Sequence, residues 1–191
     1  LLESITGGKA LMAILSNYAV NSLVTSTCEV DSSLFSNDKA QAFNIAKKIE
    51  MASKFSKMDI FRATTHNKGI FNGIDAVVIA TGNDWRAIEA GGHAYAVKDG
   101  KYSGLTEWTF DEENNILRGK LTLPMPVASV GGSIGLNPTV KTAFNILNNP
   151  DAKTLAGIIV SVGLAQNFAA LKALVSTGIQ KGHMKLQARS L

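Results

Sequence analysis

The sequence is poor in cysteine, which limits what its chemistry can be. Its single cysteine, Cys28, cannot form an internal disulfide, so nothing in the chain points to an oxidising compartment. Cys28 lies in the strand-like run 22–30, among β-branched and small residues. We therefore interpret it as a small core residue rather than as a nucleophile.

The chain also lacks a long hydrophobic run. Its longest apolar stretches are residues 76–81 and 155–170, and Ser161, Gln166 and Asn167 interrupt the second. A membrane-spanning helix needs about 20 consecutive apolar residues, and neither stretch approaches that length. No signal peptide is visible either. The sequence therefore predicts a protein that does not bind a membrane.

Neither sign of charge strongly predominates in the sequence. Lysine and arginine number 19 against 15 aspartates and glutamates, for a formal net charge of +4. There is no run of basic residues and no basic stripe with interleaved aromatics, which argues against nucleic acid as a partner. The slight excess of positive charge suits an anionic ligand, although it is equally typical of a solvated surface. A hydrophobic content of 46% is typical of a globular chain.

Several familiar motifs are missing. There is no Gly-x-Gly-x-x-Gly turn and no phosphate-binding loop with a lysine. The glycine-rich run 131–135 is best interpreted as a tight turn before a helix, although such a turn could also contact an anion. The three histidines, His66, His93 and His183, have no metal-ligand spacing and no cysteine partners, so a zinc site is not expected.

Hydrophobic periodicity and turn residues predict a mixed α+β fold. We expect strands at residues 10–15 and 22–30, helices at 38–55, 68–80 and 84–97, a β-hairpin over 105–123, and helices at 138–147 and 151–175. A change from a strand-rich start to a glycine-punctuated helical part places a boundary near residues 56–62.

Three polar residues stand out from apolar or glycine-rich surroundings: Lys68, Asp84 and His183. A lysine at a buried helix start is costly unless a carboxylate pairs with it. Asp84 would supply that carboxylate if the two helices fold back on each other; alternatively it is the N-cap of the helix that follows it. His183 could equally be a surface residue. Composition and periodicity alone therefore leave the function open.

The sequence segments around these residues resemble those of a known family. Residues 66–75 (HNKGIFNGID), 80–87 (ATGNDWRA) and 173–186 (ALVSTGIQKGHMKL) resemble the lysine, aspartate and histidine segments of the 3-hydroxy-3-methylglutaryl-coenzyme A (HMG-CoA) reductases. The form is most similar to the bacterial class II enzymes. The match is dense from residue 62 onward and looser over residues 1–30. Three long motifs in the right order make this a specific signal.

The resemblance implies a fold and its division into domains. It implies an α+β chain that combines a helix-rich large, substrate-binding domain with the tail end of a small, cofactor-binding domain. Residues 1–58 would belong to the small NAD(P)-binding domain, residues 59–180 to the large catalytic domain, and residues 181–191 to the start of a C-terminal flap.

The resemblance also implies an activity, the reduction of HMG-CoA to mevalonate and coenzyme A by two hydrides from NADH or NADPH. Lys68 would face the reacting carbonyl oxygen, and Asp84 would hydrogen-bond Lys68 and hold it charged. His183 would protonate the departing thiolate of coenzyme A.

Five more positions match binding residues of the family. Arg62 would pair with a carboxylate of the substrate, and the amide of Asn72 would help to bind its acyl portion. Gln166 and Asn167 match further active-site positions; as amides in an apolar helix they need polar partners. Asn17 would lie near the nicotinamide and the substrate.

The chain departs from the family pattern in two segments. The catalytic glutamate motif and the dinucleotide-binding turn are absent, and Glu50, Glu89 and Glu107 do not lie in such a motif. The chain begins without methionine and ends soon after His183, so we expect a partial chain. By resemblance, the enzyme would be a cytoplasmic homodimer or larger homo-oligomer with active sites between subunits. Two alternatives remain: a catalytically incomplete core that only binds substrate or assembles, and a generic module that binds an anionic metabolite.

Overall fold

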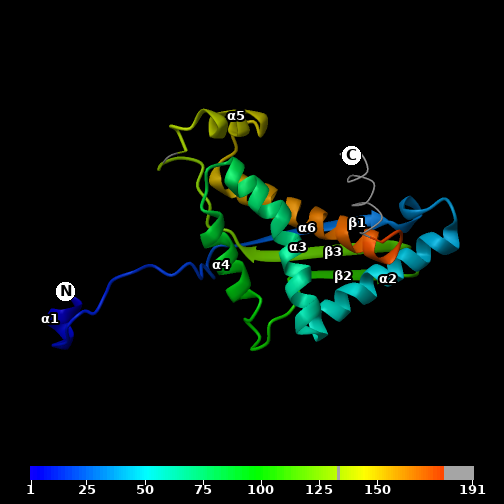
Figure 1. The fold of residues 1–191 in the computed structure, drawn as a ribbon, viewed down its shortest axis with the longest axis horizontal. Helices are drawn as coiled ribbons and strands as arrows, with labels where there is room; N and C mark the ends of the chain where they lie inside the picture. The colour runs from blue at the N-terminus through cyan, green and yellow to red at the C-terminus, as the bar shows by residue number, and fades with distance from the viewer. Residues whose placement is uncertain (133, 179–191) are drawn as a thin grey trace, which may run out of the picture.

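The computed structural model describes residues 1–132 and 134–178 as a helix-rich chain around one small sheet (Figure 1). The elements follow in the order α1 (Leu2–Thr6), β1 (Leu23–Asp31), the short 3-10 helix η1 (Ser32–Phe35), α2 (Lys39–Met58), α3 (Ile60–Ala80), α4 (Trp85–Tyr95), β2 (Thr106–Asp111), β3 (Ile116–Pro124), α5 (Pro138–Ile146) and α6 (Ala152–Val175). The predicted α+β class is confirmed at this level.

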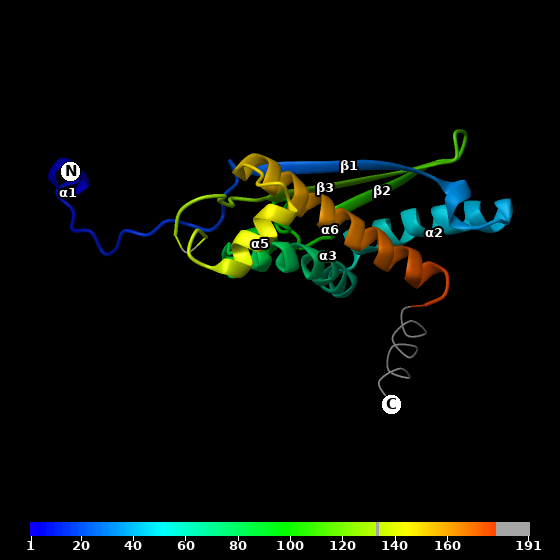
Figure 2. The ribbon, with the colours of Figure 1, turned by 90° about the horizontal axis from the view of Figure 1, so that it is seen from above.

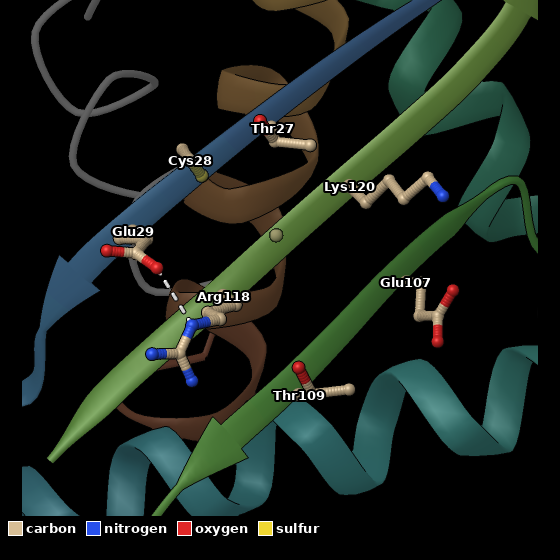
Figure 3. A pocket seen from close by; sticks show the side chains of 8 residues that line it. Thr27, Cys28, Glu29, Glu107, Thr109, Arg118 and Lys120 are labelled. Atoms are coloured by element: carbon tan, nitrogen blue, oxygen red, sulfur yellow. Dashed lines mark hydrogen bonds and ion pairs between the residues drawn. The ribbon is translucent and has the colours of Figure 1, made fainter. Parts of the chain in front are cut away.

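The three strands form an antiparallel sheet in the order β1-β3-β2, in which β2 and β3 are a hairpin. Alternate residues point to opposite faces, so Trp108, Leu117 and Leu121 are buried on the inner face. The outer face carries polar side chains such as Thr27 and Lys120 (Figure 3). One apolar and one polar face are typical of an antiparallel sheet covered on a single side.

Helices α2, α3 and α6 lie on one side of the sheet (Figure 2). Helix α6 packs against β1, β3 and α3, and α2 packs against β2. Their apolar side chains and the inner face of the sheet enclose one core, whose fully buried members include Ile49, Ile70, Phe71, Ile74, Trp108, Leu121, Leu155 and Ile159.

One aspartate makes the corner between α2 and α3. The backbone N–H of Asp59 donates to the carbonyl of Phe55 at the end of α2. Its side-chain oxygen accepts from the backbone N–H of Arg62 at 2.6 Å and caps the start of α3. The predicted start of this helix at residue 68 is therefore wrong. The polar run between Thr64 and Lys68 hides the apolar period, although it is helical.

Most of the other predicted elements are confirmed with boundaries shifted by a few residues. The strand at 22–30, the hairpin and the helices at 38–55, 84–97, 138–147 and 151–175 all occur. The strand expected at residues 10–15 is wrong. No described strand pairs with this segment, and Leu11, Ile14 and Leu15 are 91%, 84% and 95% exposed. Apolar composition alone does not make a strand that has no partner.

The boundary predicted between residues 58 and 59 does not separate two cores. Strand β1, before the boundary, pairs along its whole length with β3, after it. Helix α2 contributes Ile45, Ala46 and Ile49 to the same core as α3 and α6. The N-terminal part of the segment before β1, in contrast, extends away from this core (Figures 1 and 2), and α1 buries none of its residues.

Helix α6 alone among the described helices is long and apolar enough, by composition, to cross a membrane. In this structure it is instead a core helix, with Leu155, Ile159 and Leu171 fully buried against the sheet and α3.

Two glycines of α6 offer a matched test of how closely it packs. A Cβ at Gly163 would lie 2.9 Å from Ile74 and 3.2 Å from Leu121, both fully buried, whereas a Cβ at Gly157 would meet nothing within 4 Å. We expect Gly163→Ala to lower the free energy of unfolding by about 1–3 kcal/mol through overpacking. Gly157→Ala should raise it by about 0.5–1 kcal/mol through helix propensity. Urea unfolding followed by circular dichroism measures both; equal effects would contradict the close packing at Gly163.

Candidate functional site

A cleft of about 740 Å³ lies between α3 and α6. Five residues that the sequence proposed for substrate or catalysis line it. Three of them, Arg62, Lys68 and Asn72, come from α3, and two, Gln166 and Asn167, come from α6. The rest of the lining consists of Thr65, His66, Gly69, Ala170, Ala173, Leu174, Thr177 and Gly178. Residues about 100 positions apart in the chain are therefore brought to one surface.

The crossing of the two helices explains why these side chains meet. At Gly73 a Cβ would lie 3.0 Å from the Cβ of Gln166 and 3.2 Å from Val162, so glycine lets α3 approach α6 closely at this position. Asn72 and Gln166 are next to this contact and point to the cleft rather than into the core. Lys68 and Gly69 lie one helical turn before Asn72 on α3.

The cleft is cationic and rich in amides. Arg62 and Lys68 bring positive charge, and burial lowers the pKa of Arg62 from its ordinary value. An arginine stays charged under such a shift. Among the described residues that line the cleft there is no aspartate or glutamate. A site with two cations, three amides and no carboxylate is suited to an anionic, oxygen-rich ligand.

Behind this lining lies a buried polar network. Asn167 is 2% exposed, and its Oδ1 accepts from Trp108 Nε1 and from Thr106 Oγ1, both at 2.9 Å. His66, also buried, has its Nε2 2.6 Å from Thr106 Oγ1 and 3.2 Å from Asn167 Nδ2. The prediction that the amide of Asn167 needs polar partners is confirmed, and β2 supplies two of them.

His66 is the site residue that sequence reasoning missed. It was noted only for its lack of metal-ligand spacing, yet it lines the cleft and joins α3 to β2. Burial, and then the positive charges of Arg62 and Lys57, lower its pKa from 6.5 to about 3, so the ring is neutral. The feature of the sequence that could have indicated its role is the pair of adjacent polar residues His66 and Asn67, directly before the predicted helix start at residue 68.

Asp84 lies apart from Lys68 within this chain. It is the N-cap of α4, as the alternative interpretation predicted: its Oδ1 accepts from the backbone N–H groups of Arg86 and Ala87 at 3.0 and 3.2 Å. Its carboxylate also lies 3.6 Å from the guanidinium of Arg86. Twelve residues of α3, roughly 18 Å, separate Lys68 from the helix end at Ala80. No hydrogen bond or ion pair joins Lys68 to Asp84 in the described residues.

The two remaining predicted residues are not in the cleft. Asn17 is exposed on the N-terminal arm, where its backbone oxygen lies against α4: a Cβ at Gly91 would be 2.7 Å from it. His183 lies outside the described residues. Among those that are described, no group of three histidine, cysteine or acidic side chains could hold a metal ion.

A second hollow, of about 530 Å³, lies on the outer face of the sheet (Figure 3). Arg118 Nε donates to Glu29 Oε1 at 2.8 Å, whereas Lys120 and Glu107 are cross-strand neighbours with no ion pair between them in the part of the chain that the structure describes. It contains none of the residues that the sequence proposed for the site. The α3–α6 cleft is therefore the stronger candidate.

Comparison with known proteins is decisive at this point. The model of the family "Hydroxymethylglutaryl-coenzyme A reductase" matches residues 1–188. The chain belongs to the HMG-CoA reductase family. A curated HMG-CoA reductase of Archaeoglobus fulgidus is 44% identical over 190 residues, which are all of this chain and 42% of that protein. A probable HMG-CoA reductase of Borreliella burgdorferi is 44% identical over 153 residues, 80% of this chain and 35% of its own length.

Solved structures of the family agree. The HMG-CoA reductase of Streptococcus pneumoniae is 63% identical, with a TM-score of 0.91 over 99% of this chain and 45% of that one. The class II enzyme of the same organism bound to NADPH in open conformations gives a TM-score of 0.90 at 63% identity. The resemblance to the HMG-CoA reductases is thereby confirmed. The chain spans less than half the length of these relatives.

The buried neutral His66 predicts a pH dependence of stability. In the unfolded chain its pKa is about 6.5, whereas the folded ring stays neutral down to about 3. The unfolded state therefore binds more protons between these values, and the free energy of unfolding falls as the pH falls. The contribution of this residue is at most about 1.4 kcal/mol per pH unit.

Asp75, whose pKa is raised to about 6 by burial and by Glu89, acts in the opposite direction over part of this range. The test therefore compares the free energies of unfolding of two proteins at each pH, so that the contribution of Asp75 cancels. Urea unfolding of His66→Gln and of the unchanged protein at several pH values should give a stability gap that narrows as the pH falls from 6.5 towards 3. A gap that is constant with pH would contradict a buried neutral histidine.

Proposed function

We propose that this chain provides the substrate side of the active site of an HMG-CoA reductase. The reaction is the two-step reduction of HMG-CoA to mevalonate and coenzyme A with NADH or NADPH. The observation that carries the proposal is the α3–α6 cleft, in which Arg62, Lys68 and three amides meet and to which the described residues contribute no carboxylate. The membership of the chain in the family supports the same assignment.

Each residue of the cleft has a chemical task in this proposal. Arg62 binds the free carboxylate of the substrate, for which a guanidinium offers two parallel N–H groups. Lys68 faces the thioester carbonyl, where its ammonium stabilises the oxyanion that forms as hydride arrives and donates a proton to the alcohol oxygen. Asn72 and Gln166, both exposed to the cleft, hydrogen-bond the acyl portion. His183 protonates the thiolate of coenzyme A as it leaves.

The described residues do not by themselves build a site for the dinucleotide. Asn17, the one position that the family resemblance relates to the cofactor, is exposed, and its backbone oxygen lies against α4 outside the cleft. We therefore assign the binding of NADH or NADPH chiefly to parts of the enzyme beyond the cleft. We further propose that residues 1–22 belong to the small domain and that the large domain begins at β1, because β1 pairs along its whole length with β3, which lies in the range proposed for the large domain.

We also propose that two subunits complete the site. Lys68 and Asp84 are both exposed and are not joined within the chain. The face of α3 that carries Lys68 and Asn72 also carries two exposed apolar side chains: Phe61 is 83% exposed and Ile79 is 56% exposed. A second subunit that covers this apolar face would bring its own Asp84 to Lys68. By the family resemblance we also propose that the enzyme is cytoplasmic and that it is a homodimer or larger homo-oligomer.

The decisive variant is Lys68→Ala in an active reductase that carries this chain. Loss of the ammonium should lower kcat by about 100-fold or more, because it removes the charge that stabilises the oxyanion. Mevalonate-dependent reduction of NAD(P)+, followed by absorbance, measures it. Lys153→Ala, an exposed lysine at the start of α6, is the control and should keep full activity. Retained activity in Lys68→Ala would overturn the role of Lys68. If the full-length protein that carries this chain shows no turnover before any substitution, the binding-only core is the correct interpretation instead.

Mixed oligomers test the shared site. We expect Lys68→Ala and Asp84→Ala enzymes to be inactive alone and to regain part of the activity when they are co-expressed or unfolded and refolded together. In a mixed dimer one site would combine the intact lysine of one subunit with the intact aspartate of the other. If both residues acted within one chain, mixing would restore nothing. Activity assays on affinity-purified mixed dimers distinguish the two outcomes.

A further inference from the structure

The amide of Asn167 has a fixed orientation, and its partners reveal which end faces the cleft. The indole nitrogen of Trp108 can only donate a hydrogen bond, so the atom of Asn167 that lies 2.9 Å from it must be the carbonyl oxygen. The same oxygen accepts from the hydroxyl of Thr106 at 2.9 Å. Both lone pairs of Oδ1 are then occupied by partners on β2. The NH2 group is left on the side of His66 and the cleft.

The proton of Thr106 in turn fixes His66. A threonine hydroxyl has one proton, and Thr106 uses it towards Asn167. The 2.6 Å contact between Thr106 Oγ1 and His66 Nε2 must therefore have the histidine as donor. In the opposite arrangement Nε2 carries no proton, and the 2.6 Å contact would place its lone pair against the lone pairs of Thr106 Oγ1 with no proton between them. It would also place an N–H at Nδ1, which is buried and has no hydrogen-bond partner among the described residues.

The hydrogen bonds are therefore donated in one direction: His66 donates to Thr106, and Thr106 donates to Asn167. With a proton on Nε2, the 3.2 Å contact between His66 and Asn167 Nδ2 joins two donors and is not a hydrogen bond. The described residues then offer no acceptor to either N–H of Asn167. Arg62 and Lys57 face His66 from α3 and α2, and the ring remains neutral across the working range of pH.

We infer that His66 is a positioning residue which acts through Thr106, together with Trp108, to hold Asn167 with its N–H groups facing the cleft. Asn167 thus serves as a hydrogen-bond donor, and the ligand atom that it meets is an acceptor, a carbonyl or carboxylate oxygen. The identity of the ligand as HMG-CoA rests on the proposed function; the orientation of the amide does not. Together with Arg62 and Lys68, this makes the wall of the cleft a set of donors.

Asn167→Asp tests the direction of the amide at the ligand. Trp108 and Thr106 would keep one carboxylate oxygen in place, and the other oxygen would replace the NH2 group. We expect the Kd for HMG-CoA, measured by calorimetry on the full-length enzyme at neutral pH, to rise by about tenfold or more. Binding should recover at lower pH, where the protonated carboxyl donates again. Binding at neutral pH equal to that of the unchanged enzyme would show an acceptor at this position and would overturn the inference.

Paired variants of Thr106 and His66 test the positioning role. Thr106→Val removes the hydroxyl at nearly constant volume, and Thr106→Ser keeps it. His66→Leu removes the donor, and His66→Gln retains an amide N–H. We expect Thr106→Val and His66→Leu to raise KM for HMG-CoA several-fold, and Thr106→Ser and His66→Gln to restore it largely. If the network is only structural, the Tm will fall in Thr106→Val while KM is unchanged, and this result would overturn the positioning role.

The tautomer can be tested without any ligand. Nitrogen-15 NMR of histidine-labelled enzyme should show His66 protonated at Nε2 and unprotonated at Nδ1, and His66→Gln identifies the signal. The reverse pattern would overturn the inference whatever the enzyme binds. Conversely, an enzyme that shows the expected tautomer but fails to bind HMG-CoA would overturn the proposed substrate and leave the orientation of Asn167 established.

Discussion

The close crossing of α3 and α6 is the constraint on which the rest of the structure depends. Glycines at 73 and 163 let the two helices approach to a distance that a Cβ at either position would prevent without movement of its neighbours. This contact buries Ile74 and Leu164 in the core and leaves Asn72 and Gln166 beside it in the cleft. Packing and site are therefore consequences of the same contact. A wider crossing would loosen the core and separate the polar groups that face the ligand.

The sequence predicted most of this fold because the periodic signals are strong. The hairpin around residues 111–115 alternates cleanly, and α2 and α6 have aspartate N-caps and long apolar patterns. Where prediction failed, the deciding partner was remote. Residues 10–15 look like a strand, but a strand exists only with a neighbour. The first two turns of α3 look polar because His66 and Asn67 find their partners around residues 103–106, which no local pattern indicates.

The candidate site was predicted to a similar degree. Motif resemblance proposed Arg62, Lys68, Asn72, Gln166 and Asn167, and the structure brings these five residues to one cleft. The resemblance gave no orientation to any of them. It also suggested a Lys68–Asp84 pair that the chain alone does not form, because a helix holds the two residues apart. Sequence motifs indicate which residues bind a ligand. Whether each residue presents a donor or an acceptor depends on the buried hydrogen-bond partners behind it, which only the structure shows.

The contact between Trp108 and Gly119 extends this constraint further. A side chain at 119 would occupy the space of the Trp108 ring on the neighbouring strand, so the indole depends on a glycine there. The same indole fixes the oxygen of Asn167. Position 119 is not among the described residues that line the α3–α6 cleft, and yet its size affects whether an amide in that cleft can keep its orientation. If Asn167 binds the substrate as proposed, the absence of a side chain at position 119 contributes to substrate recognition through the packing of Trp108.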